Sequence, residues 1–121
     1  MGAPLADYPD SFGSHRGVVF HHSGPASYTP VTYAPIAGGD VVQVEESGLR
    51  LFDIVMGGSY SDSGLYWVKS VAPAANSSAN KQAAPASRWI LGWFYADEKN
   101  QVDALANLSN ETVRLFALGR Y

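Results

Sequence analysis

The chain has 121 residues and a mass of 13.0 kDa, which suits one domain and leaves no room for a second independent core. Its net charge of −3 argues against a basic nucleic-acid footprint, and the absence of cysteine excludes disulfides, thiolate metal ligands and a cysteine nucleophile. The longest strongly apolar run, residues 89–96, is far shorter than the roughly 20 residues that cross a bilayer. The first ten residues lack the basic and apolar regions of a secretory signal, so we expect neither secretion nor a membrane partner.

Charged residues are scarce and aromatic residues are plentiful. Charged residues make up 16% of the chain, compared with about 25% in ordinary globular domains, and aromatic residues make up 12%. A small domain has much surface for its volume, so this composition indicates that part of the surface is covered by another molecule. The alternative is a neutral, tyrosine-rich β-domain whose surface is hydrated by Gly, Ser and Asn.

In chain order, residues 1–14 come first and are rich in Gly, Pro and Asp without periodicity, which predicts an irregular N-terminal arm. Residues 15–121 then form the body, in which short runs of β-branched and aromatic residues alternate with turn-forming residues. Within residues 28–36, Pro30 and Pro35 restrict the segment to an edge strand or an extended loop. The predicted strands cover residues 16–22, 28–36, 41–46, 49–56, 65–71, 88–96 and 111–119.

The segments between these strands predict their connections. Ser47 and Gly48 suit a tight hairpin between the third and fourth predicted strands. Residues 57–64 predict a Gly/Ser loop, and residues 72–87, which are rich in Ala, Ser and Asn, predict a long exposed loop. Within residues 97–107, Asp97 is a candidate N-cap of one short helix. These elements predict an all-β fold, a single compact sandwich with jelly-roll-like connections, ahead of an up-and-down barrel.

Three of the predicted strands are apolar on both faces. Alternate residues of a strand share a face, and residues 89–95, 49–56 and 65–71 leave little room for a polar outer face. Each strand is either central and covered on both sides or in contact with a partner. Three such strands together favour burial in an interface.

Candidate catalytic residues are weakly marked. Adjacent His21 and His22 point to opposite faces of a strand, so they cannot ligate one metal ion without a bend, and His15 lies near the arm. A Ser–His–Asp triad has no nucleophile-elbow motif to support it, and the glycine pairs lack the lysine and helix of a phosphate-binding loop. We therefore predict no catalytic residue, no metal ligand and no cofactor, while a carboxylate pair that meets in space remains open as a hydrolase site.

Aromatic side chains offer a different kind of site. Trp67, Trp89, Trp93 and Tyr95 could form a flat platform on which sugars stack, which would make the chain a carbohydrate-binding β-sandwich module, for example on a tail or fibre. Aromatic residues more commonly serve as core or interface anchors. That platform would require two or more of these rings to lie exposed in a row.

The whole chain resembles the small head decoration, or cement, proteins of tailed bacteriophages. The resemblance is carried by the irregular arm of residues 1–14, the compact β-body, the Ala/Ser/Asn-rich residues 72–87 and the closing segment ETVRLFALGRY, residues 111–121. It implies a non-enzymatic structural protein on the outer surface of the virion head, made in the host cytoplasm. Such a protein forms homo-oligomers, binds the major capsid protein or other virion proteins, and stabilises the particle.

The contacts predicted for this role involve the strand faces and the arm. The body would present apolar strand faces to its own copies or to a shell protein, and residues 1–14 would extend across a neighbour, adding backbone hydrogen bonds to a sheet edge. The candidate interface residues are Phe20, Tyr33, Phe52, Trp67, Trp89, Trp93 and Phe116.

Overall fold

The structure is a computed structural model that describes residues 15–33, 35–74 and 85–121. The predicted arm, residues 1–14, lies outside the described residues, as does most of the predicted loop at residues 72–87. The first described strand, β1 (His15–Ser23), therefore begins the body.

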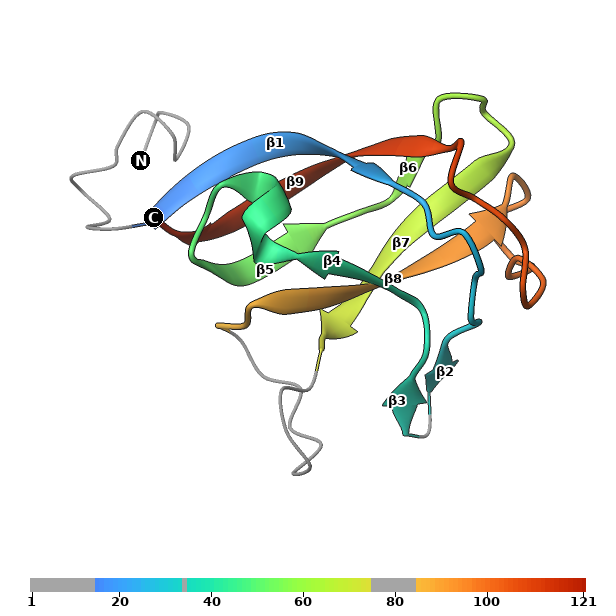
Figure 1. Ribbon diagram of the computed structural model, residues 1–121, viewed down its shortest axis with the longest axis horizontal. Helices are drawn as coiled ribbons and strands as arrows, with labels where there is room; N and C mark the ends of the chain where they lie inside the picture. Colours follow the sequence, from blue (N-terminus) through green and yellow to red (C-terminus); the bar gives the residue numbers. More distant parts are fainter. Residues whose placement is uncertain (1–14, 34, 75–84) are drawn as a thin grey trace.

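Two antiparallel sheets face each other, so the prediction of an all-β sandwich is confirmed (Figure 1). One sheet has three strands in the order β1–β9–β5, and the other has four in the order β4–β8–β7–β6. The chain passes from one sheet to the other after β1, β4, β5 and β8, and a short hairpin, β2–β3, precedes β4. After β1 the strands are β2 (Thr32–Tyr33), β3 (Ile36–Ala37), β4 (Asp40–Gln43), β5 (Leu51–Met56), β6 (Ser59–Tyr60), β7 (Tyr66–Pro73), β8 (Arg88–Tyr95) and β9 (Thr112–Arg120).

The main core lies between the two sheets. It forms because β8 and β9 carry large apolar side chains at alternate positions, which point to one face of a strand, and because β5 adds Phe52 and Val55 on either side of an irregularity in its ladder. Phe52 of β5, Trp93 of β8 and Leu115 of β9 are almost completely buried there. The rings of Phe52 and Trp89 meet edge to face, and the ring of Phe20 stacks on Phe52 from β1.

A smaller apolar cluster covers the outer face of the four-stranded sheet. Ile90 of β8 points away from the main core and packs with Val31 and Ala74, and Ile36 of the β2–β3 hairpin lies against the same group. Strand β8 is therefore central, between β4 and β7, and covered on both faces by its own chain. This explains the doubly apolar residues 89–95 without any partner.

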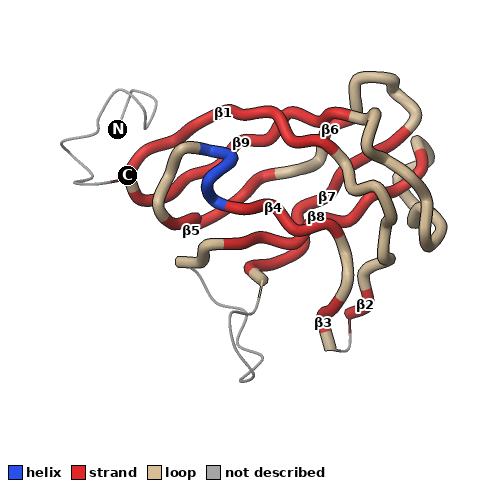
Figure 2. The backbone as a smooth tube through the Cα atoms, in the orientation of Figure 1, coloured by secondary structure: helices blue, strands red, loops and turns tan. Residues whose placement is uncertain are grey.

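Two predicted connections are wrong. Residues 44–46 do not continue β4, because the chain turns into a 3₁₀ helix, η2 (Val44–Ser47), whose N-terminus is closed by the Glu46 carboxylate accepting the Gln43 N–H (Figure 2). Strands β4 and β5 consequently belong to different sheets and do not form the hairpin expected at Ser47 and Gly48. Strand β6 lies within the segment that was predicted to be only a loop.

The helix predicted within residues 97–107 does not form. Instead of capping a helix, Asp97 accepts the N–H groups of Lys99 and Asn100 and closes a turn. Glu98 and Leu105 have positive φ angles of 61° and 69°, which no α-helix accommodates. The apolar residues Val102 and Leu108 reach the main core from irregular backbone.

Candidate interaction surface and buried polar site

The outer face of the three-stranded sheet is apolar and exposed. In the β1–β9 and β5–β9 ladders, Val19 and Met56 both lie opposite Phe116, one on each side of it. Val19 is 61% exposed and Met56 is 52% exposed. An exposed apolar row across a sheet is a typical feature of a contact surface, because apolar area in contact with water is unfavourable and a partner removes it from water.

A second row extends this surface toward the start of β1. Ile54, which is 43% exposed, lies opposite Leu118, and Leu118 lies opposite Gly17. Gly17 has a structural role, because a Cβ atom there would be 3.0 Å from Cζ of Phe116. The missing side chain thus lets the Phe116 ring lie across β1. We call this surface the apolar face; its residues are Val19, Ile54, Met56, Phe116 and Leu118.

Two hollows adjoin at one end of the apolar face, where Met56 and Gly57 line both. We call the first the β9 hollow; its volume is about 480 Å³, and its wall includes Val19, Phe116 and Arg114. We call the second the β7 hollow; its volume is about 600 Å³, and its wall includes Trp67, Lys69 and Trp89. Among the described residues neither Arg114 nor Lys69 forms an ion pair within 4.0 Å.

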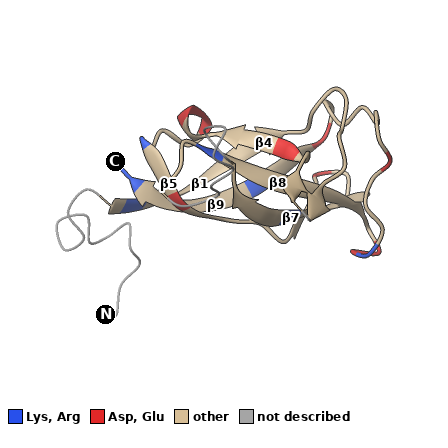
Figure 3. Ribbon diagram, turned by 90° about the horizontal axis from the view of Figure 1, so that it is seen from below, with Lys and Arg blue, Asp and Glu red and all other residues tan. Residues whose placement is uncertain are grey.

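Charged groups at the opposite end of the apolar face are arranged differently. Asp53 lies 3.3 Å from His15 and 3.8 Å from Arg120, so its charge is compensated within the chain. Arg16 stacks on the ring of Tyr121 nearby, at 3.9 Å from the ring centroid. Most of the strand ribbon carries neither acidic nor basic residues, as Figure 3 shows. Within the described ranges, Arg114 and Lys69 at the hollows have neither an ion-pair partner nor a stacked ring that any of these contacts supplies.

The structure corrects part of the predicted interface. Phe52 and Trp93 lie in the chain's own core, so they are not available to a partner, and Trp89 is buried there too, although it also forms part of the wall of the β7 hollow. The reason is that β5 and β8 direct these rings between the sheets, where a large ring fills the most volume. Phe20 is partly buried and also packs against the core.

Tyr33, Trp67 and Phe116 remain accessible, although they do not lie together. Phe116 belongs to the apolar face, Trp67 lines the β7 hollow, and Tyr33 is exposed in the β2–β3 hairpin. Their role in an interface stays a prediction.

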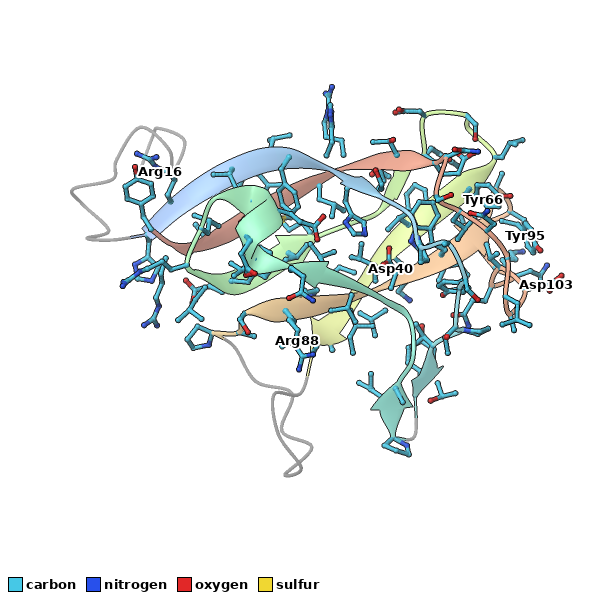
Figure 4. The ribbon with its side chains drawn as sticks, in the orientation of Figure 1. Arg16, Asp40, Tyr66, Arg88, Tyr95 and Asp103 are labelled. Carbon is cyan, nitrogen blue, oxygen red and sulfur yellow. The ribbon has the colours of Figure 1, made fainter. Side chains whose placement is uncertain are left out.

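The predicted four-ring sugar platform does not form. Trp89 and Trp93 are buried, which removes two of its four members. Trp67 packs against Tyr60 edge to face, with an interplanar angle of 67°, whereas a flat row needs coplanar rings. Tyr95 is at the far end of β8, beside Tyr66 (Figure 4).

A charged group is buried between the two sheets. His22 of β1 is 5% exposed, and its Nε2 lies 2.7 Å from Oδ2 of Asp40 in β4, which is also buried (Figure 4 labels Asp40). The other ring nitrogen, Nδ1, lies 2.6 Å from Oε1 of Glu46 in η2. The same Asp40 oxygen accepts the indole N–H of Trp93 at 2.9 Å. This network ties β1 to β4, η2 and β8.

The protonation state of His22 follows from its partners. Burial by itself would lower the pKa of the imidazole, but the hydrogen bonds and charges of Asp40 and Glu46 outweigh burial, and the net effect raises the pKa. Both carboxylates are acceptors, so both ring nitrogens donate and the ring is an imidazolium. Neither nitrogen is free to take a proton from a serine hydroxyl, as a catalytic histidine must. The arrangement serves to hold elements together.

A second buried polar group supports the neighbouring segment. Tyr28 is completely buried; its hydroxyl donates to Oε1 of Gln101 at 2.6 Å and accepts the N–H of Trp93 at 3.0 Å. Burial raises the pKa of Tyr28 to about 12, so the phenol stays neutral and keeps donating. Gln101 in turn bonds the backbone of Val31 and fixes the segment that leads to the β2–β3 hairpin.

Sequence reasoning missed most of the residues that make these sites. The opposite facing of His21 and His22 was predicted correctly, since His21 is exposed and His22 is buried, but the pairing with Asp40 and Glu46 depends on the packing of the two sheets. The alternation of Val19, His21 and of Arg114, Phe116, Leu118 was a visible signal for an outer face. This alternation does not determine which strands are neighbours in the sheet.

The described residues contain no group of His, Asp and Glu side chains arranged to hold a metal ion. In residues 15–33, 35–74 and 85–121 no helix has the length and apolar character needed to span a membrane. Comparison of the chain with protein-family models, with curated proteins and with solved structures found no match.

Proposed function

We propose that this chain is a noncatalytic structural protein that works by contacting other protein chains through the apolar face. The observation that carries the proposal is the row of Val19, Phe116 and Met56, which crosses all three strands of one sheet on its outer side. Ile54 and Leu118 widen it to a second row. Burying half-exposed aliphatic side chains of this size contributes roughly 1 kcal/mol each to association.

The second sheet supports the same conclusion by contrast. Its outer face is partly covered by Val31, Ile36 and Ala74 of the same chain, which form the smaller apolar cluster with Ile90. The three-stranded sheet has no such cover among the described residues. A partner chain is the natural cover for a face that residues 15–33, 35–74 and 85–121 leave open.

We propose further that the partner lies in a virion, where the chain decorates the outer surface of the head. The support is the resemblance of the whole sequence to the small head decoration proteins of tailed bacteriophages, through its arm, its β-body and its closing segment, residues 111–121. In this role many copies bind the major capsid protein and one another. Each contact is weak, and the repeated arrangement raises the effective concentration of the next contact.

The interaction surface is tested by a charge placed in the middle of it. In the Met56→Asp variant association must bury a carboxylate, so we expect the native mass to fall toward the 13.0 kDa of one chain in light scattering after size-exclusion chromatography. Leu105→Asp is the matched control, because Leu105 is 78% exposed and lines neither hollow. If the two variants keep the same mass, the apolar face is not the contact surface.

The virion role needs a separate measurement. Antibodies raised against the purified chain should label the outside of intact heads in electron micrographs of particles from the source culture. Particles that contain the chain but bind the antibody only after disruption would contradict an outer position. Particles that lack the chain altogether would contradict the virion role and leave the contact surface intact.

A further inference from the structure

The two hollows at the end of the apolar face are neighbours. They share Met56 and Gly57, and Gly57 is required there because a Cβ atom would be 2.7 Å from the backbone nitrogen of Ser70. The absence of a side chain lets the chain after β5 lie close to the backbone of β7. A ligand for this surface needs apolar groups for both hollows.

The charges at the hollows add a second requirement. Arg114 is an exposed residue of the β9 hollow and Lys69 an exposed residue of the β7 hollow, and neither has an ion-pair partner among the described residues. Glu98 also lines the β7 hollow and keeps its negative charge there, while its carboxylate accepts the hydroxyl of Tyr60 at 2.6 Å. The lining of the two hollows therefore carries two cations and one carboxylate, a net positive charge, although the chain as a whole has a net charge of −3. Complementarity calls for an apolar segment that carries carboxylates.

The chain itself contains such a segment, outside the described residues. Residues 4–12 read PLADYPDSF, in which three apolar side chains alternate with two carboxylates and no basic residue occurs. Pro4 and Pro9 restrict the backbone, which lowers the entropy lost when the segment is bound. The apolar residues are Leu5, Tyr8 and Phe12, and the acidic residues are Asp7 and Asp10.

We propose that the two hollows bind residues 4–12 of a second copy of this chain, with the apolar side chains on the apolar face and Asp7 and Asp10 near Arg114 and Lys69. The inference rests on the proposed function, since it names the partner of the same surface.

The donor is a second copy because of where β1 starts. His15 pairs with Arg120 at one end of the sheet, whereas the hollows lie toward the other end, where His21 pairs with Arg114. Fourteen extended residues reach about 45 Å, which is longer than the roughly 30 Å of a nine-residue strand, so the segment is long enough to cross a neighbour.

Charge reversal in the full chain tests both the contact and its direction. One variant, Asp7→Lys/Asp10→Lys, reverses the segment, and another, Lys69→Glu/Arg114→Glu, reverses the hollows. Sedimentation velocity over a concentration series should show self-association weakened about tenfold or more in each. Mixed in equal amounts, the two variants should associate again. The unaltered segment of one variant fits the unaltered hollows of the other, and the reversed segment and the reversed hollows also carry opposite charges. The controls are Asp62→Lys/Asp103→Lys and Arg50→Glu, which reverse exposed residues that line neither hollow.

Each outcome decides the inference. If both variants associate weakly and the mixture recovers, the segment binds in a second copy. If the mixture does not recover, the segment binds its own chain or the reversals act elsewhere, and the inference is wrong. If the reversed segment leaves association unchanged while Met56→Asp abolishes it, the apolar face is the contact surface but another occupant covers it; the proposed function then stands without this inference.

Discussion

His22 shows how a single residue can link the two sheets of this domain. Its imidazolium connects β1 to Asp40 in β4 and to Glu46 in η2, and Asp40 also accepts the Trp93 indole N–H. A buried cation between two carboxylates is stable only while all three are hydrogen bonded, because removing one partner leaves a buried charge without compensation. The residue therefore couples the protonation of one ring to the packing of both sheets.

The pH dependence of unfolding should report this coupling. The pKa of His22 is raised in the folded chain, so its stabilisation is fully present below the unfolded value of 6.5 and is lost as the pH rises through the folded pKa. In urea titrations of dilute protein between pH 6 and pH 9, we expect His22→Gln to lower the free energy of unfolding at pH 6 by about 3 kcal/mol. The difference from the unsubstituted chain should shrink toward pH 9.

The neighbouring histidine provides the control for this experiment. His21 lies on the same strand but is exposed on the outer face, so His21→Gln should leave the pH profile of unfolding unchanged. If the difference between His22→Gln and the unsubstituted chain is the same at every pH, the ring is not protonated in the folded state and the coupling described above is wrong.

At the scale of elements, the sequence predicts strands well and their neighbours poorly. Runs of β-branched and aromatic residues predicted β1, β5, β7, β8 and β9 to within two residues at either end. The prediction works because these side chains pack well on the pleated surface of a sheet. The hairpin at Ser47 and Gly48 was wrong because the Glu46 carboxylate bonds both His22 and the Gln43 N–H, which requires the 3₁₀ turn of η2. No local pattern encodes a contact between residues 22 and 46.

The same limitation affected the predicted interface. Rings on β5 and β8 looked like contact residues because their strands are apolar on both faces. The order of strands in the sheets decides which apolar face is covered, and this order buries Trp89 and Trp93 and leaves Val19 and Met56 open. Of the predicted rings, Phe116 alone belongs to the apolar face, whose other members are aliphatic residues of β1, β5 and β9.

The contact between β5 and β9 depends on a glycine. Gly119 pairs with Phe52 next to an irregularity in the ladder, and a methyl group there would overlap the carbonyl oxygen of Leu51. We expect Gly119→Ala to lower the free energy of unfolding by about 3 kcal/mol, because the two strands must separate or bend to admit it. Chemical denaturation measured by tryptophan fluorescence would give the value.

A second glycine separates crowding from backbone strain in that test. Gly64 has a φ of 75° but no atom within 4 Å of the position a Cβ would take, so Gly64→Ala should cost only the strain of about 1 kcal/mol. If Gly119→Ala and Gly64→Ala lower the free energy of unfolding by the same amount, the β5–β9 contact is not crowded at Gly119.

For the whole molecule, the scarcity of charge and the open sheet face have one common consequence. A domain of 121 residues with 16% charged residues stays dispersed only if its exposed apolar rows are few or covered. One sheet is partly covered by the chain's own hairpin and the other displays the apolar face. If the apolar face is the contact surface that we propose, association should be driven mainly by removing apolar area from water.

The temperature dependence of association distinguishes this driving force from charge pairing. Burial of apolar area gives association a negative heat-capacity change, so the heat of dissociation in dilution calorimetry should change steadily between about 10 and 35 °C. Met56→Asp should show little heat at the same concentrations, while Leu105→Asp should behave as the unsubstituted chain.

Rim charges at Arg114 and Lys69 should make added salt weaken association only in part, because screening acts on charges and leaves the apolar contact. Association that has a temperature-independent heat and disappears in salt would mean that charges hold the copies together. A chain that remains monomeric at millimolar concentration would contradict association through the apolar face altogether.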